Sequence, residues 1–210
     1  IGTINNDDTA TLTFSGGSSE SESVSPRVFT ATLSAPVQGG FQVNYKTENG
    51  VTNPAIAGLD YTDNDGMLTF VGNAGEMQSF NVVIMNDNVV ELDETFTAEL
   101  GAILIGSFVQ ESSIFIVDGN QTETIENDDA AVVNIATDVS QLENAGNQTF
   151  NVTLSNPVDA VISVLFNTTN GTATTTDNDY NAVVSHTVTF PANTMAHQMV
   201  SVTINTHNKV

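Results

Sequence analysis

The stretch Phe29–Val37 (FTATLSAPV) occurs again, with changes, at Phe150–Val158 (FNVTLSNPV). The same offset of 121 residues places Asn6–Asp8 on Asn127–Asp129, which identifies an internal repeat. In the first copy, apolar and polar residues alternate up to the turn at Pro36, a pattern typical of a half-buried β-strand. The chain is therefore predicted to consist of repeated β-structure.

The repeat register divides the chain into three segments. Residues 1–8 read as the tail of a preceding repeat, residues 9–129 as a complete repeat, and residues 130–210 as a second repeat. The counterpart of residues 91–129 is missing from the second repeat, so it is expected to be truncated before its last two strands. We expect the segment to come from an array in a much longer protein.

Within the complete repeat, period-two alternation is interrupted by turns rich in Gly, Pro, Asn and Asp. Seven short strands in about 120 residues, without helical periodicity, predict an all-β chain of tandem immunoglobulin-like Greek-key β-sandwiches. The Cys-Trp-Cys signature of true immunoglobulin domains is absent, because the chain has no Cys and no Trp. The predicted strands lie near residues 9–15, 27–34, 41–47, 66–71, 77–86, 94–105 and 112–126.

The charge balance excludes several classes of partner. Against 25 acidic residues there are 3 basic ones, which gives a formal net charge of −22. Such a chain cannot neutralise phosphates, and an anionic membrane surface repels it, so no nucleic-acid partner is expected. The apolar stretches are far shorter than the roughly 20 residues that span a bilayer, so no membrane insertion is expected in this segment.

The acidic residues are concentrated in turns. If the strands of a sandwich alternate in direction, several of these turns lie at one end of it. Carboxylates brought together repel by about 1 kcal/mol per pair at 4 Å in water, and by several kcal/mol near a protein surface. Hard oxygen ligands without nearby His or Cys suit Ca²⁺. The alternative is that these are solvated loop acids; their recurrence at equivalent positions of two repeats favours the metal.

Three motifs carry a family resemblance. Asp60-Tyr61, the stretch Asn86–Phe96 (NDNVVELDETF) and Thr124–Asp129 (TIENDD) resemble the Calx-β motif, found in sodium–calcium exchangers and in bacterial surface proteins. The resemblance covers residues 9–129. It extends into the second repeat through Glu143–Gly146 and Asp179-Tyr180.

The resemblance implies calcium ligands at one end of the sandwich. Asn86 stands where a strong binder has another acid, which lowers the charge of the site. In the second repeat only Glu143 and Asp179 remain, which implies a weaker site. Carried over residue by residue, the ligands of the first repeat are Glu22, Asp60, Asp87, Glu91, Glu94, Asp128 and Asp129.

The resemblance also implies a function. We expect a calcium-binding structural repeat segment of a large bacterial cell-surface adhesin, a class that includes gliding adhesins, forming a rod that Ca²⁺ stiffens at inter-repeat junctions. Its partners would be neighbouring repeats and a surface or cell ligand bound elsewhere in the parent protein, outside the cell. The alternatives are a metal-free passive spacer and a calcium-sensor domain pair as in the exchangers. The sequence contains no catalytic motif, so an enzyme is not expected.

Overall fold

The computed structural model describes residues 2, 7–105, 108–109, 113–136 and 139–206. Most of the predicted tail 1–8, and residues 207–210 of the predicted second repeat, lie outside the described residues. The chain divides into two compact units, one of residues 1–87 and 92–128 and the other of residues 88–91 and 129–210. In the described part, no helix has the length and apolar character needed to cross a membrane.

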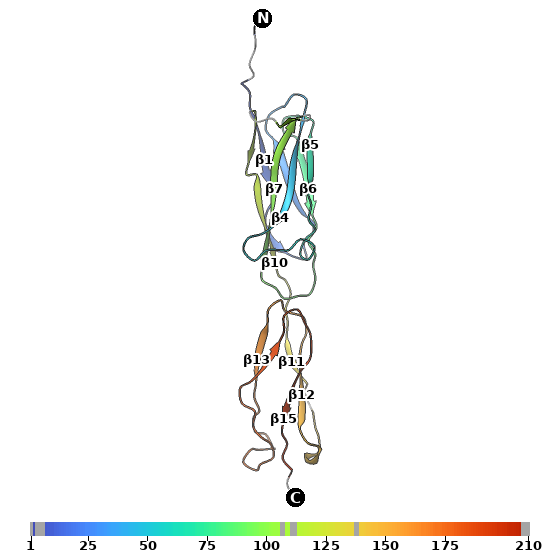
Figure 1. The fold of residues 1–210 in the computed structure, drawn as a ribbon, viewed down its shortest axis with the longest axis vertical. Helices are drawn as coiled ribbons and strands as arrows, with labels where there is room; N and C mark the ends of the chain where they lie inside the picture. Colours follow the sequence, from blue (N-terminus) through green and yellow to red (C-terminus); the bar gives the residue numbers. More distant parts are fainter. Residues whose placement is uncertain (1, 3–6, 106–107, 110–112, 137–138, 207–210) are drawn as a thin grey trace. The chain divides into compact units, whose positions relative to one another are not determined.

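The first unit is a sandwich of two sheets (Figure 1). One sheet has the strand order β6 (Met77–Val82), β3 (Arg27–Leu33), β1 (Ala10–Ser15) and β9 (Ile114–Val117). The other has the order β2 (Ser19–Ser21), β10 (Asn120–Glu126), β7 (Glu94–Ile105), β4 (Phe41–Asn49) and β5 (Gly66–Phe70), and β8 (Phe108–Val109) pairs with β7.

The connections of the first unit follow a Greek-key path. The chain leaves β3 for the other sheet, forms the antiparallel β4–β5 pair there, and returns to pair β6 with β3. It then crosses again so that β7 pairs with β4. The predicted immunoglobulin-like fold class is confirmed.

The first and last strands are each divided between the two sheets, which the sequence did not predict. At Gly16 and Gly17 the chain leaves β1 for β2 with positive φ angles of 139° and 68°. A Cβ atom at Gly16 would lie 2.4 Å from the Phe29 ring, and one at Gly17 would lie 2.6 Å from the Thr122 carbonyl oxygen. The turn at Asp118, with φ of 53°, divides the predicted strand 112–126 into β9 and β10. Both β1–β9 and β2–β10 are parallel pairs.

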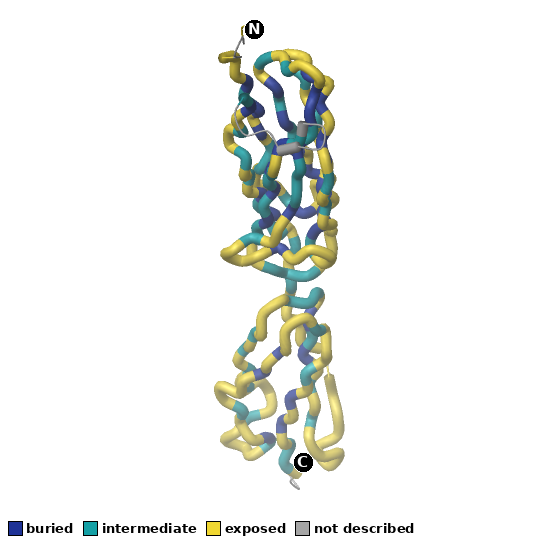
Figure 2. The backbone as a smooth tube through the Cα atoms, turned by 45° about the horizontal axis from the view of Figure 1, so that its top comes forward, coloured by how far each residue is buried: buried dark blue, intermediate teal, exposed yellow. Residues whose placement is uncertain are grey.

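The core of the first unit is built from the inward residues of both sheets, which alternate with exposed ones (Figure 2). Phe29 is stacked on Phe80 with ring centroids 5.4 Å apart and meets the edge of Phe96, from the other sheet, at 6.1 Å. The Phe29–Phe96 contact joins the two sheets across the sandwich, whereas Phe29 and Phe80 lie on neighbouring strands of one sheet. Aromatic pairs at such distances add about 0.5–1.5 kcal/mol beyond the burial of their apolar area.

One buried ion pair also joins the sheets. Arg27 at the start of β3 and Glu123 in β10 are 4% and 1% exposed, and the Arg27 Nε donates a hydrogen bond to Glu123. Glu123 also accepts from the Ser18 backbone N–H at 2.7 Å, while Arg27 donates to the carbonyl oxygens of Glu20 and Ser21 at 2.8 and 3.0 Å. The pair therefore fixes the start of β2 against both sheets.

The second unit is smaller. One sheet has the order β11 (Val133–Ile135), β12 (Gln148–Leu154) and β15 (Gln198–Val202), and the other consists of β13 (Ile162–Phe166) and β14 (His186–Phe190). One turn of 3₁₀ helix, η1 (Glu143–Ala145), precedes β12. The buried core of the second unit consists of Val152, Leu154, Val188, Phe190 and Val200.

We predict that Glu123→Ala lowers the free energy of unfolding of the first unit by about 3–5 kcal/mol, because it removes the buried carboxylate partner of Arg27 and leaves only the exposed Glu20 carboxylate, 3.2 Å away. Urea denaturation of the full chain measures the change. The matched control is Glu48→Ala, which removes an exposed partner 2.6 Å from the Lys46 Nζ and should cost less than about 1 kcal/mol. Equal effects of the two substitutions would contradict the role given to the buried pair.

Candidate metal centre

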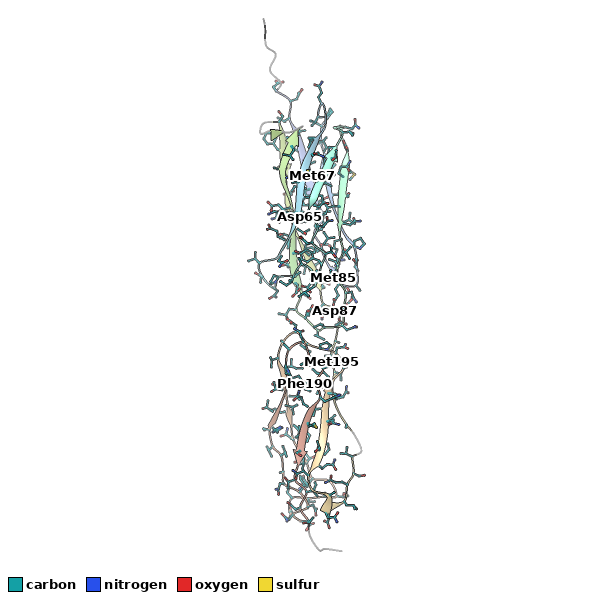
Figure 3. All side chains as sticks on the ribbon, turned by 45° about the vertical axis from the view of Figure 1, so that its right-hand side comes forward. Asp65, Met67, Met85, Asp87, Phe190 and Met195 are labelled. Atoms are coloured by element: carbon teal, nitrogen blue, oxygen red, sulfur yellow. The ribbon has the colours of Figure 1, made fainter. Side chains whose placement is uncertain are left out.

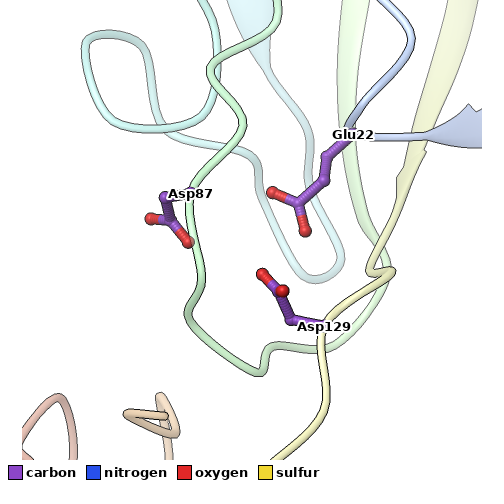
Figure 4. Close-up of side chains that lie close together, drawn as sticks. All are labelled: Glu22, Asp87 and Asp129. Atoms are coloured by element: carbon purple, nitrogen blue, oxygen red, sulfur yellow. The ribbon is translucent and has the colours of Figure 1, made fainter.

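The structure brings six of the seven predicted ligands together in two groups of three. Glu22, Asp87 and Asp129 form one group, and Asp60, Glu91 and Glu94 form the other. In each group, one carboxylate oxygen per residue lies within 4.8 Å of the others. Figure 4 shows that Glu22, Asp87 and Asp129 come from three different segments and direct their carboxylates toward a common space.

The donor set fits a hard divalent cation. Ca²⁺ binds oxygen at about 2.3–2.6 Å, so two ligands of one ion lie no more than roughly 5 Å apart, and both groups meet this limit. Each group consists of carboxylates alone, without His or Cys. In the first group Glu22 is buried, Asp129 is half-buried and Asp87 is exposed; all three residues of the second group are half-buried.

The basic residues of the described part are paired elsewhere. Arg27 binds Glu20 and Glu123, and Lys46 lies within 3.2 Å of Glu48 and Glu99. Lys209 lies outside the described residues. Arg27 and Lys46 thus form these ion pairs with acids that lie outside the two groups.

A buried tyrosine places Asp60. The Tyr61 ring is fully buried and stacked on Phe96, with centroids 4.5 Å apart, and its hydroxyl donates to Asn49 Oδ1 at 2.9 Å. The Asp60 carboxylate accepts a hydrogen bond from the Ile56 N–H at 2.5 Å. The main-chain carbonyl oxygen of Asp60 accepts one from the Met85 N–H at 2.9 Å. The last bond ties Asp60 to the segment after β6 on which Figure 3 labels Met85 and Asp87.

A second set of bonds places Glu22 and Asp129. The Glu22 N–H donates to the Glu126 carbonyl oxygen at 3.0 Å, which extends the parallel β2–β10 pair as far as Glu22. Asp93 accepts the Asn127 N–H at 3.1 Å and so joins the β6–β7 loop to the segment after β10. Sequence analysis did not single out Asp93, because nothing in the pattern distinguishes it from neighbouring loop acids.

Asp128 belongs to neither group, although the family resemblance implied that it is a ligand. Its side chain accepts a hydrogen bond from the Ser21 hydroxyl at the end of β2. Hydrogen bonds from Ser21 and then Ser23 lower the pKa of the Asp128 carboxyl. In this structure Asp128 holds β2 to the chain segment that carries Asp129, so it acts as a positioning residue.

Comparison with known proteins agrees with the fold and the motifs. The Calx-beta domain family model matches residues 5–129 and again residues 126–210. The chain belongs to the Calx-beta domain family. The predicted family resemblance is therefore confirmed, and the chain contains two tandem copies.

Three solved structures similar to this chain are of Calx domains. The apo-form Calx CBD1 domain is 22% identical with a TM-score of 0.49, covering 58% of this chain and 100% of that chain. CBD12 from CALX1.2 is 21% identical with a TM-score of 0.48, covering 92% of this chain and 76% of that chain. The calcium binding domain CBD12 of CALX1.1 is 23% identical with a TM-score of 0.47, and the match covers 92% of this chain and 75% of that chain. No curated protein matches the chain.

The second Calx-beta copy repeats the scaffold of the site. Asp179 accepts the Thr174 N–H at 2.7 Å, and its carbonyl oxygen accepts the Asn205 N–H at 2.9 Å. The Tyr180 hydroxyl donates to Asn170 Oδ1 at 2.8 Å, as Tyr61 does to Asn49. Among the described residues, neither Asp179 nor the exposed Glu143 of η1 lies in a group of three potential ligands. The weaker second site thus stays a prediction.

The environment of Tyr61 has a measurable consequence. Burial raises the pKa of Tyr61 to about 12, and the negative charges of Asp63 and Glu48 add to the shift. Between pH 10 and pH 12 the unfolded chain loses the phenolic proton while the folded chain keeps it. The stability that this proton confers is therefore complete below about pH 10 and is lost as the pH rises toward 12.

We predict that a titration of the tyrosine absorbance of the native chain contains one late step near pH 12. Tyr61→Phe should remove that step, whereas Tyr180→Phe, which deletes the equivalent hydroxyl of the second copy, should leave it in place. A late step that survives in Tyr61→Phe would contradict the burial of Tyr61 beside the acids.

Proposed function

We propose that this chain is a calcium-binding structural segment of a large bacterial cell-surface adhesin, in which Ca²⁺ stiffens the junction between neighbouring Calx-beta repeats. The proposal rests on the two groups of acidic residues. In each group, three carboxylate oxygens, one from each residue, lie within 4.8 Å of one another. Acids that repel one another gain most from a divalent ion that all of them can bind at once.

The chemistry of the ligands favours Ca²⁺ over other metals. Carboxylates without imidazole or thiolate select hard cations, and Mg²⁺ demands a more regular octahedral site. Extracellular calcium modules work at dissociation constants of about 10⁻⁴–10⁻³ M, because the ion is plentiful outside cells. The net charge of −22 favours solubility of such a repeat.

The order of the ligands along the chain supports a role at the junction. Asp87 directly precedes residues 88–91, which count with the second unit, and Asp129 directly follows Asp128, the last residue of the first unit. Glu22 belongs to the first unit alone. In the sequence, Asp87 and Asp129 thus stand next to two of the three points at which the chain passes from one unit to the other.

We predict that Ca²⁺ narrows the range of arrangements of the two repeats, measured by small-angle X-ray scattering of the full chain with Ca²⁺ and with chelator. The double variant Glu22→Gln with Glu94→Gln, which removes one charge from each group, should lose the response. Asp118→Asn should keep it, because Asp118 stands at the β9–β10 turn, at the opposite end of β10 from Asp128.

The same profiles separate the alternatives. A change from one defined arrangement to another would indicate a calcium sensor. No response to Ca²⁺ would indicate a passive spacer. An equal response in the double variant would show that the two acidic groups do not cause the change. Each of these outcomes contradicts the proposal.

A further inference from the structure

Four residues of the β6–β7 loop belong to the second unit. Residues 88–91 count with residues 129–210, although the sequence on both sides of them counts with the first unit. From Met85 to Asp93, only residues 89–91 are not exposed, so this part of the loop is sheltered. The second unit therefore holds these residues by a contact of its own.

The contact is a parallel pairing of main chains. Val90 pairs with Val158, in the turn between β12 and β13. The Val90 N–H donates to the Pro157 carbonyl oxygen, and the Val90 carbonyl oxygen accepts from the Asp159 N–H, each at 3.0 Å. Both distances are normal for main-chain hydrogen bonds. Val90 thus uses both of its main-chain groups, and no carboxylate takes part in either bond.

The turn that receives Val90 is held in shape by the second unit itself. The Asn193 N–H donates to the Val158 carbonyl oxygen at 2.8 Å, and the Asn193 side chain donates to the Asp159 carboxylate at 2.8 Å. Asn193 has a positive φ of 55°, a conformation that Asn adopts more readily than most residues. These bonds leave the Pro157 carbonyl oxygen and the Asp159 N–H for Val90.

The charges of the two segments favour main-chain bonds over ion pairs. Glu91 lies beside Val90, and Asp159 lies in the turn, so both partners carry an acid. Acids on both partners repel, whereas neutral N–H and C=O groups pair regardless of that charge. Val90 and Val158 are both half-buried, so the pairing also removes apolar surface from water.

We propose that the turn Pro157–Asp159 is a docking site for residues 88–91, which the second repeat holds through main-chain bonds and without a cation. Its partner is an extended segment of this chain, recognised by one N–H and one C=O group, as in the addition of a strand to a sheet. The attachment adds to the peptide bond between Asp128 and Asp129. It persists without Ca²⁺, which distinguishes it from the stiffening proposed above.

Amide hydrogen exchange of the ¹⁵N-labelled full chain, followed by NMR in the presence of chelator, tests the proposal. We expect the Val90 and Asp159 amides to exchange at least about tenfold more slowly than in an unstructured chain, because both are donors in the pairing. Asp159 is an exposed residue, so slow exchange of its amide reports the hydrogen bond rather than burial.

Two variants separate the main chain from the side chain. Val90→Pro removes the N–H that Pro157 accepts, and the Asp159 amide should then exchange at nearly the unstructured rate. Val90→Ala keeps both main-chain groups and should preserve the protection of Asp159. In both variants the Asn193 amide, which donates to Val158, should stay protected and so report that the turn is intact.

Unprotected Val90 and Asp159 amides in chelator would overturn the proposal. If Ca²⁺ then restored their protection, docking would require the cation, and the calcium site alone would stand. Unchanged protection of Asp159 in Val90→Pro would also overturn the proposal, because the partner of that amide would then lie elsewhere. A scattering profile that does not respond to Ca²⁺ would contradict the stiffening and leave these exchange rates as expected.

Discussion

Repulsion between carboxylates is the constraint on which the end of the first Calx-beta repeat depends. Six acids from four separate segments of the sequence lie in two groups, and within each group one carboxylate oxygen per residue lies within 4.8 Å of the others. A neutral scaffold holds them there: Tyr61 packs on Phe96, and the Asp60 carbonyl oxygen binds the Met85 N–H. The energy that keeps the acids close comes from buried aromatic surface and backbone hydrogen bonds, while the charges oppose it.

A comparison of the two repeats distinguishes this scaffold from the acidic groups that it supports. The Asp-Tyr-Asn arrangement of the first repeat recurs as Asp179, Tyr180 and Asn170, with hydrogen bonds of similar length. The buried ion pair of the first repeat does not recur in the same form, because Gln148 stands at the position of Arg27. The scaffold thus belongs to the fold of both repeats, whereas the acidic groups in the described residues belong to the first alone.

Much of the fold of the first repeat and of its acidic site could be predicted from the sequence, because strands and acidic turns are local patterns. Alternation located the strands of the first repeat, and the resemblance to the Calx-β motif implied which acids meet. The division of the last strand at Asp118 was missed, because a hairpin turn and a change of sheet have the same local signature. The pairing of Arg27 with Glu123 and the bond from Ser21 to Asp128 join residues that are far apart in the sequence, so only the fold reveals them.

The central claim is that the grouped acids of the first repeat are a calcium site, and calorimetric unfolding of the full chain tests it most directly. With a dissociation constant of about 10⁻⁴–10⁻³ M, roughly 10 mM Ca²⁺ stabilises the folded unit by about 1.4–2.7 kcal/mol per ion. The account predicts that the transition of the first repeat rises by several degrees in Ca²⁺ relative to chelator. An identical transition in both conditions would contradict it.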